Sequence, residues 1–186
     1  MGVGERFFEV NIGRSMIPKE LTEYVKNLEK NVGEGRGLLI LGPTGTGKTS
    51  SLVVIMKHIL KKYGCILGSD LGLRILKTDC EMIFASSNQV FNSIFNREFD
   101  FINDCRLVEI LMIDDFGREY FHDFPFSEFE DMIDYRYSHK LSTFVTSNLT
   151  PKALREIKAY RRVVDRWIQT NDIIQISGPS MRKQQC

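Results

Sequence analysis

Apolar residues along the chain follow two alternating patterns, the 3.6-residue period of amphipathic helices and short continuous runs. The continuous runs are typical of strands that are buried on both faces. We predict strands at 38–41, 82–85, 108–113, 143–146 and 173–176, and helices at 17–32, 49–63, 88–95, 151–158 and 160–169. This alternation predicts an α/β fold, in which helices flank both faces of a five-stranded parallel sheet.

Another helix is predicted between the third and fourth strands. Ser127 is followed three residues later by Glu130, which is the pattern of a capping box at a helix N-terminus. The buried face of this helix would be formed by Phe129, Met132, Ile133 and Tyr137. Residues 65–80 fit neither period well. The sequence leaves two alternatives for them, a surface hairpin or an insertion.

The composition is that of one globular domain. The 186 residues are 42% hydrophobic and 26% charged, which excludes disordered and coiled-coil proteins. The longest apolar runs, such as 52–56, are much shorter than the about 20 residues of a membrane span, and residues 1–10 lack the apolar stretch of a signal peptide. The four cysteines have neither disulfide nor zinc-site spacing. We therefore expect a cytoplasmic protein without a membrane partner.

Charge is distributed unevenly, although the net charge is only +1. Residues 98–134 include twelve acidic and two basic residues, whereas residues 151–186 include eight basic and three acidic residues. Solvated charged faces are the simplest interpretation of both stretches. A basic footprint over the whole chain is absent, so any contact with nucleic acid must rest on a local surface.

A glycine-rich phosphate loop follows the first predicted strand. The residues Gly42-Pro43-Thr44-Gly45-Thr46-Gly47-Lys48-Thr49 match the pattern GxxxxGK[ST] between a strand and a helix, which is the context that this motif requires. Backbone N–H groups of such a loop surround an anion at the positive end of the helix. Lys48 would reach the β- and γ-phosphates of ATP, and the Thr49 hydroxyl would hold Mg²⁺. Ser50 completes the predicted nucleotide-binding residues.

Two acidic residues follow the apolar strand at 108–113. Ligands of open α/β sheets bind beyond the carboxyl ends of the strands, which is where Asp114 and Asp115 lie. Adjacent residues of a strand point to opposite faces, so the two carboxylates should have different roles. Asp114 would hold Mg²⁺ through water, and Asp115 would orient and deprotonate the water that attacks the γ-phosphate.

The phosphate loop, the Asp114-Asp115 pair and the strand ending in Thr146-Ser147-Asn148 together resemble the AAA+ ATPases. Six segments in this order resemble the DnaC and DnaI replicative helicase loaders and their relative IstB: 37–43, 113–117, 135–137, 146–149, 164–166 and 178–182. The resemblance implies a three-layer P-loop NTPase fold with a five-stranded parallel sheet and ATP or ADP with Mg²⁺ as its ligands.

The resemblance also implies roles for two further residues. Asn148 matches sensor 1, the polar residue that contacts the γ-phosphate or the attacking water. Arg166 matches the arginine finger that reaches the nucleotide of a neighbouring subunit. Arg162, one helical turn earlier, competes for that role, and a surface arginine paired with a nearby carboxylate is the plainer alternative for Arg166. The predicted catalytic set is therefore Lys48, Asp115, Asn148 and Arg166.

The sequence departs from the wider family at three places. Asp115 is one methylene shorter than the usual glutamate, which favours slow hydrolysis. Ten residues follow Ile176, which are too few for a helical lid domain. An N-terminal segment at 1–17 is too short for a helicase-binding domain, so we expect an ATPase domain at 18–178 and a tail at 179–186.

The function that the resemblance implies is ATP- and Mg²⁺-dependent helicase loading. Such an ATPase would assemble head to tail on single-stranded DNA and hydrolyse ATP slowly. Residues 86–104 are polar and aromatic but hardly basic, so DNA binding should be weak and dependent on ATP. The alternatives are an IstB-like transposition helper and a nucleotide-gated DNA-binding switch with little hydrolysis. A P-loop kinase is disfavoured because no arginine-rich lid follows the expected pattern.

Overall fold

The computed structural model describes residues 18–63, 66–68, 73–76, 81–117 and 123–178. The predicted segments 1–17 and 179–186 lie outside these residues. The described strands form one sheet in the order β2-β3-β4-β5-β6-β1-β7. Their bounds are β1 Leu38–Leu41, β2 Ile66–Gly68, β3 Leu73–Leu76, β4 Met82–Ser86, β5 Ile110–Phe116, β6 Ser142–Ser147 and β7 Asp172–Gln175.

Five of these strands confirm the predicted parallel sheet. β4, β5, β6, β1 and β7 pair with one another in parallel. β2 and β3 pair antiparallel with each other, and β3 pairs antiparallel with β4. Residues 66–68 and 73–76 thus form two short antiparallel strands that extend the sheet beyond β4, which agrees with the hairpin alternative.

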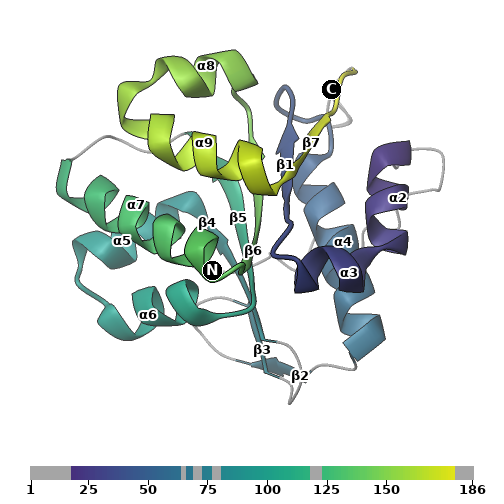
Figure 1. Cartoon of the computed structure of the whole chain (residues 1–186), viewed down its shortest axis with the longest axis horizontal. Helices are drawn as coiled ribbons and strands as arrows, with labels where there is room; N and C mark the ends of the chain where they lie inside the picture. Colours follow the sequence, from purple (N-terminus) through teal and green to yellow (C-terminus); the bar gives the residue numbers. More distant parts are fainter. Residues whose placement is uncertain (1–17, 64–65, 69–72, 77–80, 118–122, 179–186) are drawn as a thin grey trace, which may run out of the picture.

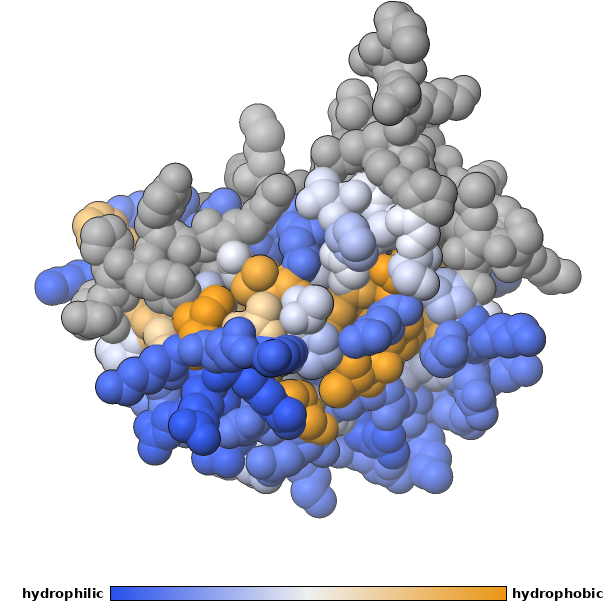
Figure 2. Space-filling model, turned by 90° about the horizontal axis from the view of Figure 1, so that it is seen from above, coloured by the Kyte–Doolittle hydropathy of each residue, from blue (hydrophilic) through white to orange (hydrophobic). Residues whose placement is uncertain are grey.

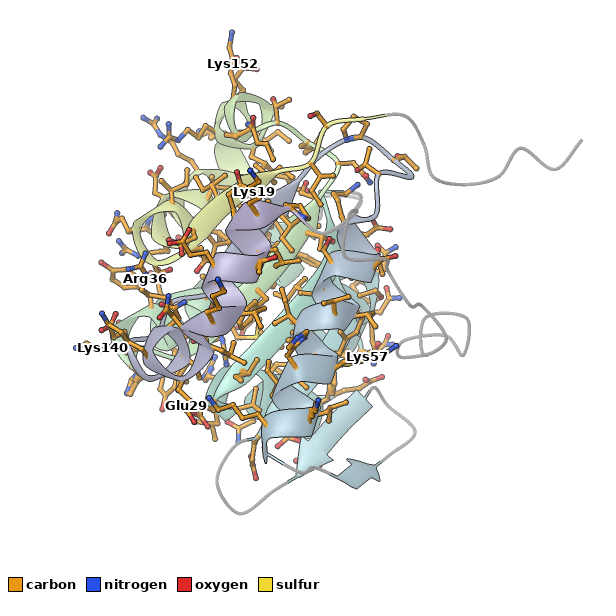
Figure 3. All side chains as sticks on the ribbon, turned by 90° about the vertical axis from the view of Figure 1, so that its right-hand side faces the viewer. Lys19, Glu29, Arg36, Lys57, Lys140 and Lys152 are labelled. Atoms are coloured by element: carbon orange, nitrogen blue, oxygen red, sulfur yellow. The ribbon has the colours of Figure 1, made fainter. Side chains whose placement is uncertain are left out.

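Helices cover both faces of the sheet, which gives three layers (Figure 1). One layer consists of α2 Lys19–Lys26, α3 Leu28–Gly33 and α4 Lys48–Tyr63. Figure 3 faces this layer and labels Lys19, Glu29 and Lys57 at its outer side. The other layer consists of α5 Ser87–Phe95, α6 Phe99–Leu107, α7 Asp123–Ser138, α8 Pro151–Glu156, the 3₁₀ turn η2 Lys158–Tyr160 and α9 Arg161–Thr170.

Alternation along the strands divides the core between the two faces. In β1, Leu39 and Leu41 pack in the cluster of α5 to α9, whereas Leu38 and Ile40 pack in the cluster of α2 to α4. All four are buried, as expected of a central strand. At the end of β5, the ring of Phe116 lies 4.6 Å from Tyr160 and 4.8 Å from Trp167, so aromatic packing fixes η2 and α9 beside the site.

The helices differ from the predicted ones in several places. The helix at 17–32 is interrupted at Asn27 (φ −106°, ψ 21°), whose backbone N–H bonds to the carbonyls of Tyr24 and Val25. The side chain of Asn27 also donates from Nδ2 to the Glu23 carbonyl at 3.4 Å, and such local side-chain bonds of Asn compete with a continuous helix. A helix not predicted, α6, follows α5, and α7 begins at Asp123, so Ser127 lies inside a helix instead of capping one. On α7, Phe129, Met132 and Ile133 are buried as predicted, and Arg136 (1% exposed) is buried too, whereas Tyr137 is only half-buried.

Candidate active site

The phosphate loop joins the end of β1 to the start of α4, at the carboxyl edge of the sheet. Gly45 (φ 84°) and Gly47 (φ 92°) adopt left-handed backbone conformations, which glycine accepts without steric cost. The loop is closed on itself, because the Thr46 hydroxyl donates to the Pro43 carbonyl at 2.8 Å and Lys48 Nζ donates to the same oxygen at 2.9 Å. Ser50 lies in the first turn of α4 and is half-buried.

Lys48, Asn148 and Asp115 form one chain of hydrogen bonds. Lys48 is 5% exposed, and its Nζ donates to Asn148 Oδ1 at 2.6 Å. Asn148 Nδ2 donates in turn to Asp115 Oδ1 at 3.4 Å. The Thr44 hydroxyl also donates to Asn148 Oδ1, at 3.4 Å. Asn148 thus connects the phosphate-loop lysine to the second carboxylate of the acidic pair.

Thr49 and Asp114 meet at the other side of the site. The Thr49 hydroxyl lies 3.0 Å from both carboxylate oxygens of Asp114, and the Thr146 hydroxyl donates to Asp114 Oδ1 at 2.5 Å. Burial raises the pKa of Asp114, the nearby charge of Asp115 raises it further, and the hydrogen bonds from Thr146 and Thr49 oppose the shift. A cation at this carboxylate would offset the cost of its burial.

The two aspartates diverge because of a bulge. Asp114 keeps the regular register opposite Ser86 of β4, but the pairing of β5 with β6 shifts between Ile113 and Phe116. Asp115 sits in this shift with φ 59°, which is uncommon for a residue other than glycine. Its N–H donates to Thr146 Oγ1 at 2.9 Å, and its carbonyl accepts from Ser87 Oγ at 3.0 Å. The separate directions arise from this bulge and not from the simple strand alternation that we expected.

The donor set fits a magnesium nucleotide. Mg²⁺ usually binds one or two protein oxygens and completes its shell with phosphate and water, and Thr49 Oγ1 and Asp114 offer such oxygens side by side. No cluster of three or more His, Cys, Asp or Glu residues that could hold a metal occurs within the described ranges. The residues that could hold ATP are those of the loop itself, with Lys48 beside them.

Arg166 lies away from this cluster, on α9. Its Nε donates to Asp134 Oδ1 of α7 at 2.9 Å. Arg162 donates to Glu130 Oε1 at 2.5 Å in the same way. The structure therefore pairs both candidate finger residues with carboxylates of their own chain, and the role of Arg166 in a neighbour's site stays a prediction.

Residues 86–104, the candidate region for DNA binding, lie on α5 and α6, and only part of their apolar side chains are packed in the core. Val90 and Ile94 are buried, but Phe95 is 64% exposed and Phe99 is 71% exposed. The ring of Phe91 instead packs inward on Phe129, 4.8 Å away. The aromatic residues at the turn between the two helices are thus available at the surface.

Two residues of the site were not predicted from the sequence. Thr146 bridges both aspartates, and Ser87 holds the backbone of Asp115. Thr146 lies near the end of β6 and Ser87 directly follows β4, and both strands are neighbours of β5. The sequence signal that could have found them is therefore a hydroxyl residue at the carboxyl end of each adjacent strand.

Figure 2 looks down on the end of the molecule where α8 and the C-terminal end of β7 lie, and hydrophobic residues gather across the middle of that face.

Comparisons with known proteins place the fold. No protein-family model and no curated protein sequence matches the chain. Among solved structures, the DnaC helicase loader matches with a TM-score of 0.71 at 22% identity, over 93% of this chain and 99% of that one. DnaI matches with a TM-score of 0.64 at 23% identity, over 95% and 89%. The replication initiator DnaA, bound to AMPPCP and single-stranded DNA, matches with a TM-score of 0.67 at 20% identity, over 93% and 50%.

The chain has the P-loop AAA+ fold. These likenesses confirm the predicted fold class and the resemblance to DnaC and DnaI at the level of structure. The chain spans about half of the DnaA chain and nearly all of the DnaC chain. None of the helices in the described ranges is long and apolar enough to cross a membrane.

Proposed function

We propose that the protein is an AAA+ ATPase that binds ATP with Mg²⁺ and hydrolyses it during the loading of a replicative DNA helicase. The observation that carries the ATPase part is the chain from Lys48 Nζ through Asn148 to Asp115 Oδ1. It joins a phosphate-binding cation, an amide and a carboxylate on three neighbouring elements. Such a set can bind a γ-phosphate and position water beside it.

The mechanism assigns one task to each side chain. The loop N–H groups and Lys48 would bind the phosphates, and Thr49 and Asp114 would hold Mg²⁺, which would supply positive charge against that of the phosphates. Asn148 orients the attacking water, and Asp115 accepts its proton at a carboxylate oxygen. Asp115 is held by the bulge at both its N–H and its carbonyl, so its reach is fixed by Thr146 and Ser87.

The test separates nucleotide binding from hydrolysis. Lys48→Ala should weaken ATP binding measured by calorimetry with Mg²⁺, because it removes the cation at the β- and γ-phosphates. Asp115→Asn should preserve binding and abolish phosphate release, because it removes only the proton acceptor. Lys61→Ala, an exposed change on the same helix α4, is the matched control and should behave as wild type. Equal ATP affinity of Lys48→Ala and wild type would refute the site.

The finer parts of the proposal concern partners. DnaC is a helicase loader, and the DnaA structure contains single-stranded DNA. By analogy, this protein would assemble head to tail on single-stranded DNA, with Arg166 of one subunit completing the site of the next. DNA binding should require ATP and weaken with salt at a shallow logarithmic slope of about 0.7 per phosphate contact. Equal affinity for duplex DNA would contradict this part, and co-purification with the tagged protein would identify the helicase.

The same measurements distinguish two alternative functions from helicase loading. ATP binding without turnover would favour a nucleotide-gated DNA-binding switch, for which the short side chain of Asp115 is the supporting feature. Co-purification of a transposase in place of a helicase would favour an IstB-like transposition helper. Phosphate release without any acceptor molecule would exclude a kinase.

A further inference from the structure

Three side-chain pairs connect α7 and α9, which lie side by side on one face of the sheet (Figure 1). Glu130 pairs with Arg162, Asp134 with Arg166 and Tyr137 with Gln169, each across 32 positions in the sequence. The spacing of four and then three residues places each set of three on one stripe of its helix. Arg166 is therefore the middle member of the set and has neighbours on both sides.

The guanidinium of Arg166 is held at two points. Its Nε donates to Asp134 Oδ1 at 2.9 Å, and its Cζ lies 4.7 Å from the centre of the Tyr137 ring. Tyr137 is itself fixed, because its hydroxyl donates to Gln169 Oε1 at 2.8 Å. An arginine held by its Nε and by stacking loses little further rotational freedom when it binds an anion.

The remaining donors of Arg166 are the ones suited to a phosphate. A guanidinium has five N–H groups, of which Nε supplies one and the two terminal nitrogens supply four. In the part of the chain that the structure describes, the terminal nitrogens have no hydrogen-bond partner, and the side chain is 35% exposed. The contact with Asp134 thus orients the arginine through Nε and leaves both terminal nitrogens to bind phosphate oxygens bidentately.

Arg162 differs from Arg166 in these respects. It is 75% exposed, and its terminal nitrogen Nη1 is the atom that binds Glu130. No ring stacking of Arg162 is found among the described residues. Arg162 is consequently less restrained, and its phosphate-binding end is occupied by Glu130.

We infer that Asp134 and Tyr137 are positioning residues that hold Arg166 ready to bind the γ-phosphate of a nucleotide in an adjacent subunit. This inference rests on the proposed ATPase function. Asp134 would act through Arg166 and would not touch the nucleotide.

The test compares Asp134→Ala with Glu130→Ala, its matched control one turn earlier on α7. Steady-state hydrolysis is measured at saturating protein, ATP and single-stranded DNA. Asp134→Ala should lower kcat by roughly 10- to 100-fold, because misplacement of a catalytic group has effects of that size. ATP affinity should be unchanged, and the melting temperature should fall by no more than about 2 °C, because a partly exposed ion pair contributes little to stability. Glu130→Ala should retain wild-type kcat.

Two further variants separate positioning from structural effects. Asp134→Asn keeps an oxygen that can accept from Nε, so it should recover most of the lost kcat. In the double variant Asp134→Ala, Arg166→Ala, kcat should equal that of Arg166→Ala alone, because Asp134 has nothing left to position. A mixture of Asp134→Ala with Lys48→Ala should regain part of the activity, since Lys48→Ala offers an intact Arg166 to the intact phosphate loop of the other subunit.

The possible failures are distinguishable. Absence of hydrolysis by wild type refutes the proposed ATPase function itself. Wild-type kcat of Arg166→Ala in assembled protein refutes the finger and the inference together. A loss in Arg166→Ala with wild-type kcat in Asp134→Ala leaves the finger in place and overturns the positioning role. An increase in kcat of Asp134→Ala also overturns it, because the ion pair would then restrain Arg166 from acting.

Discussion

The most buried charge of the described structure is Arg136, and its removal should strongly destabilise the fold. The side chain is 1% exposed and has no carboxylate among its described hydrogen-bond partners. Its shortest bonds go to the carbonyls of Ser142 at 2.6 Å, Val108 at 2.7 Å and Cys105 at 2.9 Å. Burial lowers its pKa, and the oxygen dipoles around it replace the lost hydration.

The magnitude follows from the backbone groups that Arg136 satisfies. Arg136→Met keeps much of the side-chain volume but removes the buried hydrogen bonds to three carbonyls, and each such loss costs about 1–3 kcal/mol. Relief from burying a charge offsets part of this loss. We expect the free energy of unfolding to fall by about 3–5 kcal/mol, a large fraction of the roughly 5–15 kcal/mol of a typical domain. The melting temperature should fall by about 10 °C.

Urea unfolding followed by circular dichroism measures this change, with the slope on urea showing whether unfolding stays two-state. Arg155→Met is the matched control, because Arg155 is 55% exposed and its ion pair with Asp165 spans 4.0 Å. That control should change stability by less than about 0.5 kcal/mol. Arg136→Lys should lie between the two, since an ammonium lacks the planar fork of guanidinium. Equal midpoints of Arg136→Met and Arg155→Met would refute the reasoning.

Three further changes test the site and the close packing of the strands. Without Mg²⁺, Asp114→Asn should raise the melting temperature, because the raised pKa of Asp114 means that its ionised form costs stability above pH about 4. The gain in melting temperature should disappear as the pH falls below that value, and a gain that does not depend on pH would contradict this origin. Thr146→Val should lower the free energy of unfolding in urea by about 1–3 kcal/mol and slow hydrolysis, because it removes the oxygen that accepts from the Asp115 N–H. Unchanged stability would argue against this role of Thr146. Gly37→Ala should lower the free energy of unfolding by more than about 1 kcal/mol, since the added Cβ would lie 2.0 Å from the Thr143 carbonyl oxygen. Gly33→Ala, whose Cβ would have nothing within 4 Å, should be neutral or stabilising, and the melting temperatures of the two variants test this difference.

The parallel sheet was predictable because its signal is local. β1, β4 and the first part of β5 are short apolar runs, and β1 is buried on both faces. β6 is instead rich in β-branched and aromatic residues, which also favour a strand. The missed helix α6 shows the opposite case. Its apolar residues include Phe99 and Leu107, which are 71% and 50% exposed. Exposed apolar residues blur the 3.6-residue period, because periodicity reports burial only when apolar residues lie inside.

In the candidate site, too, the local features could be predicted from the sequence and the features that depend on distant residues could not. The phosphate loop is contiguous in sequence, and its glycines and Lys48 could be assigned from the motif alone. The geometry of Asp115 could not, because its left-handed backbone is fixed by hydroxyl groups that lie 31 and 28 residues away, on Thr146 and Ser87. Likewise, Arg166 finds its partner 32 residues earlier, in Asp134. Residue types at strand ends therefore predict which groups meet, whereas the conformations in which they meet depend on contacts that only the folded chain brings together.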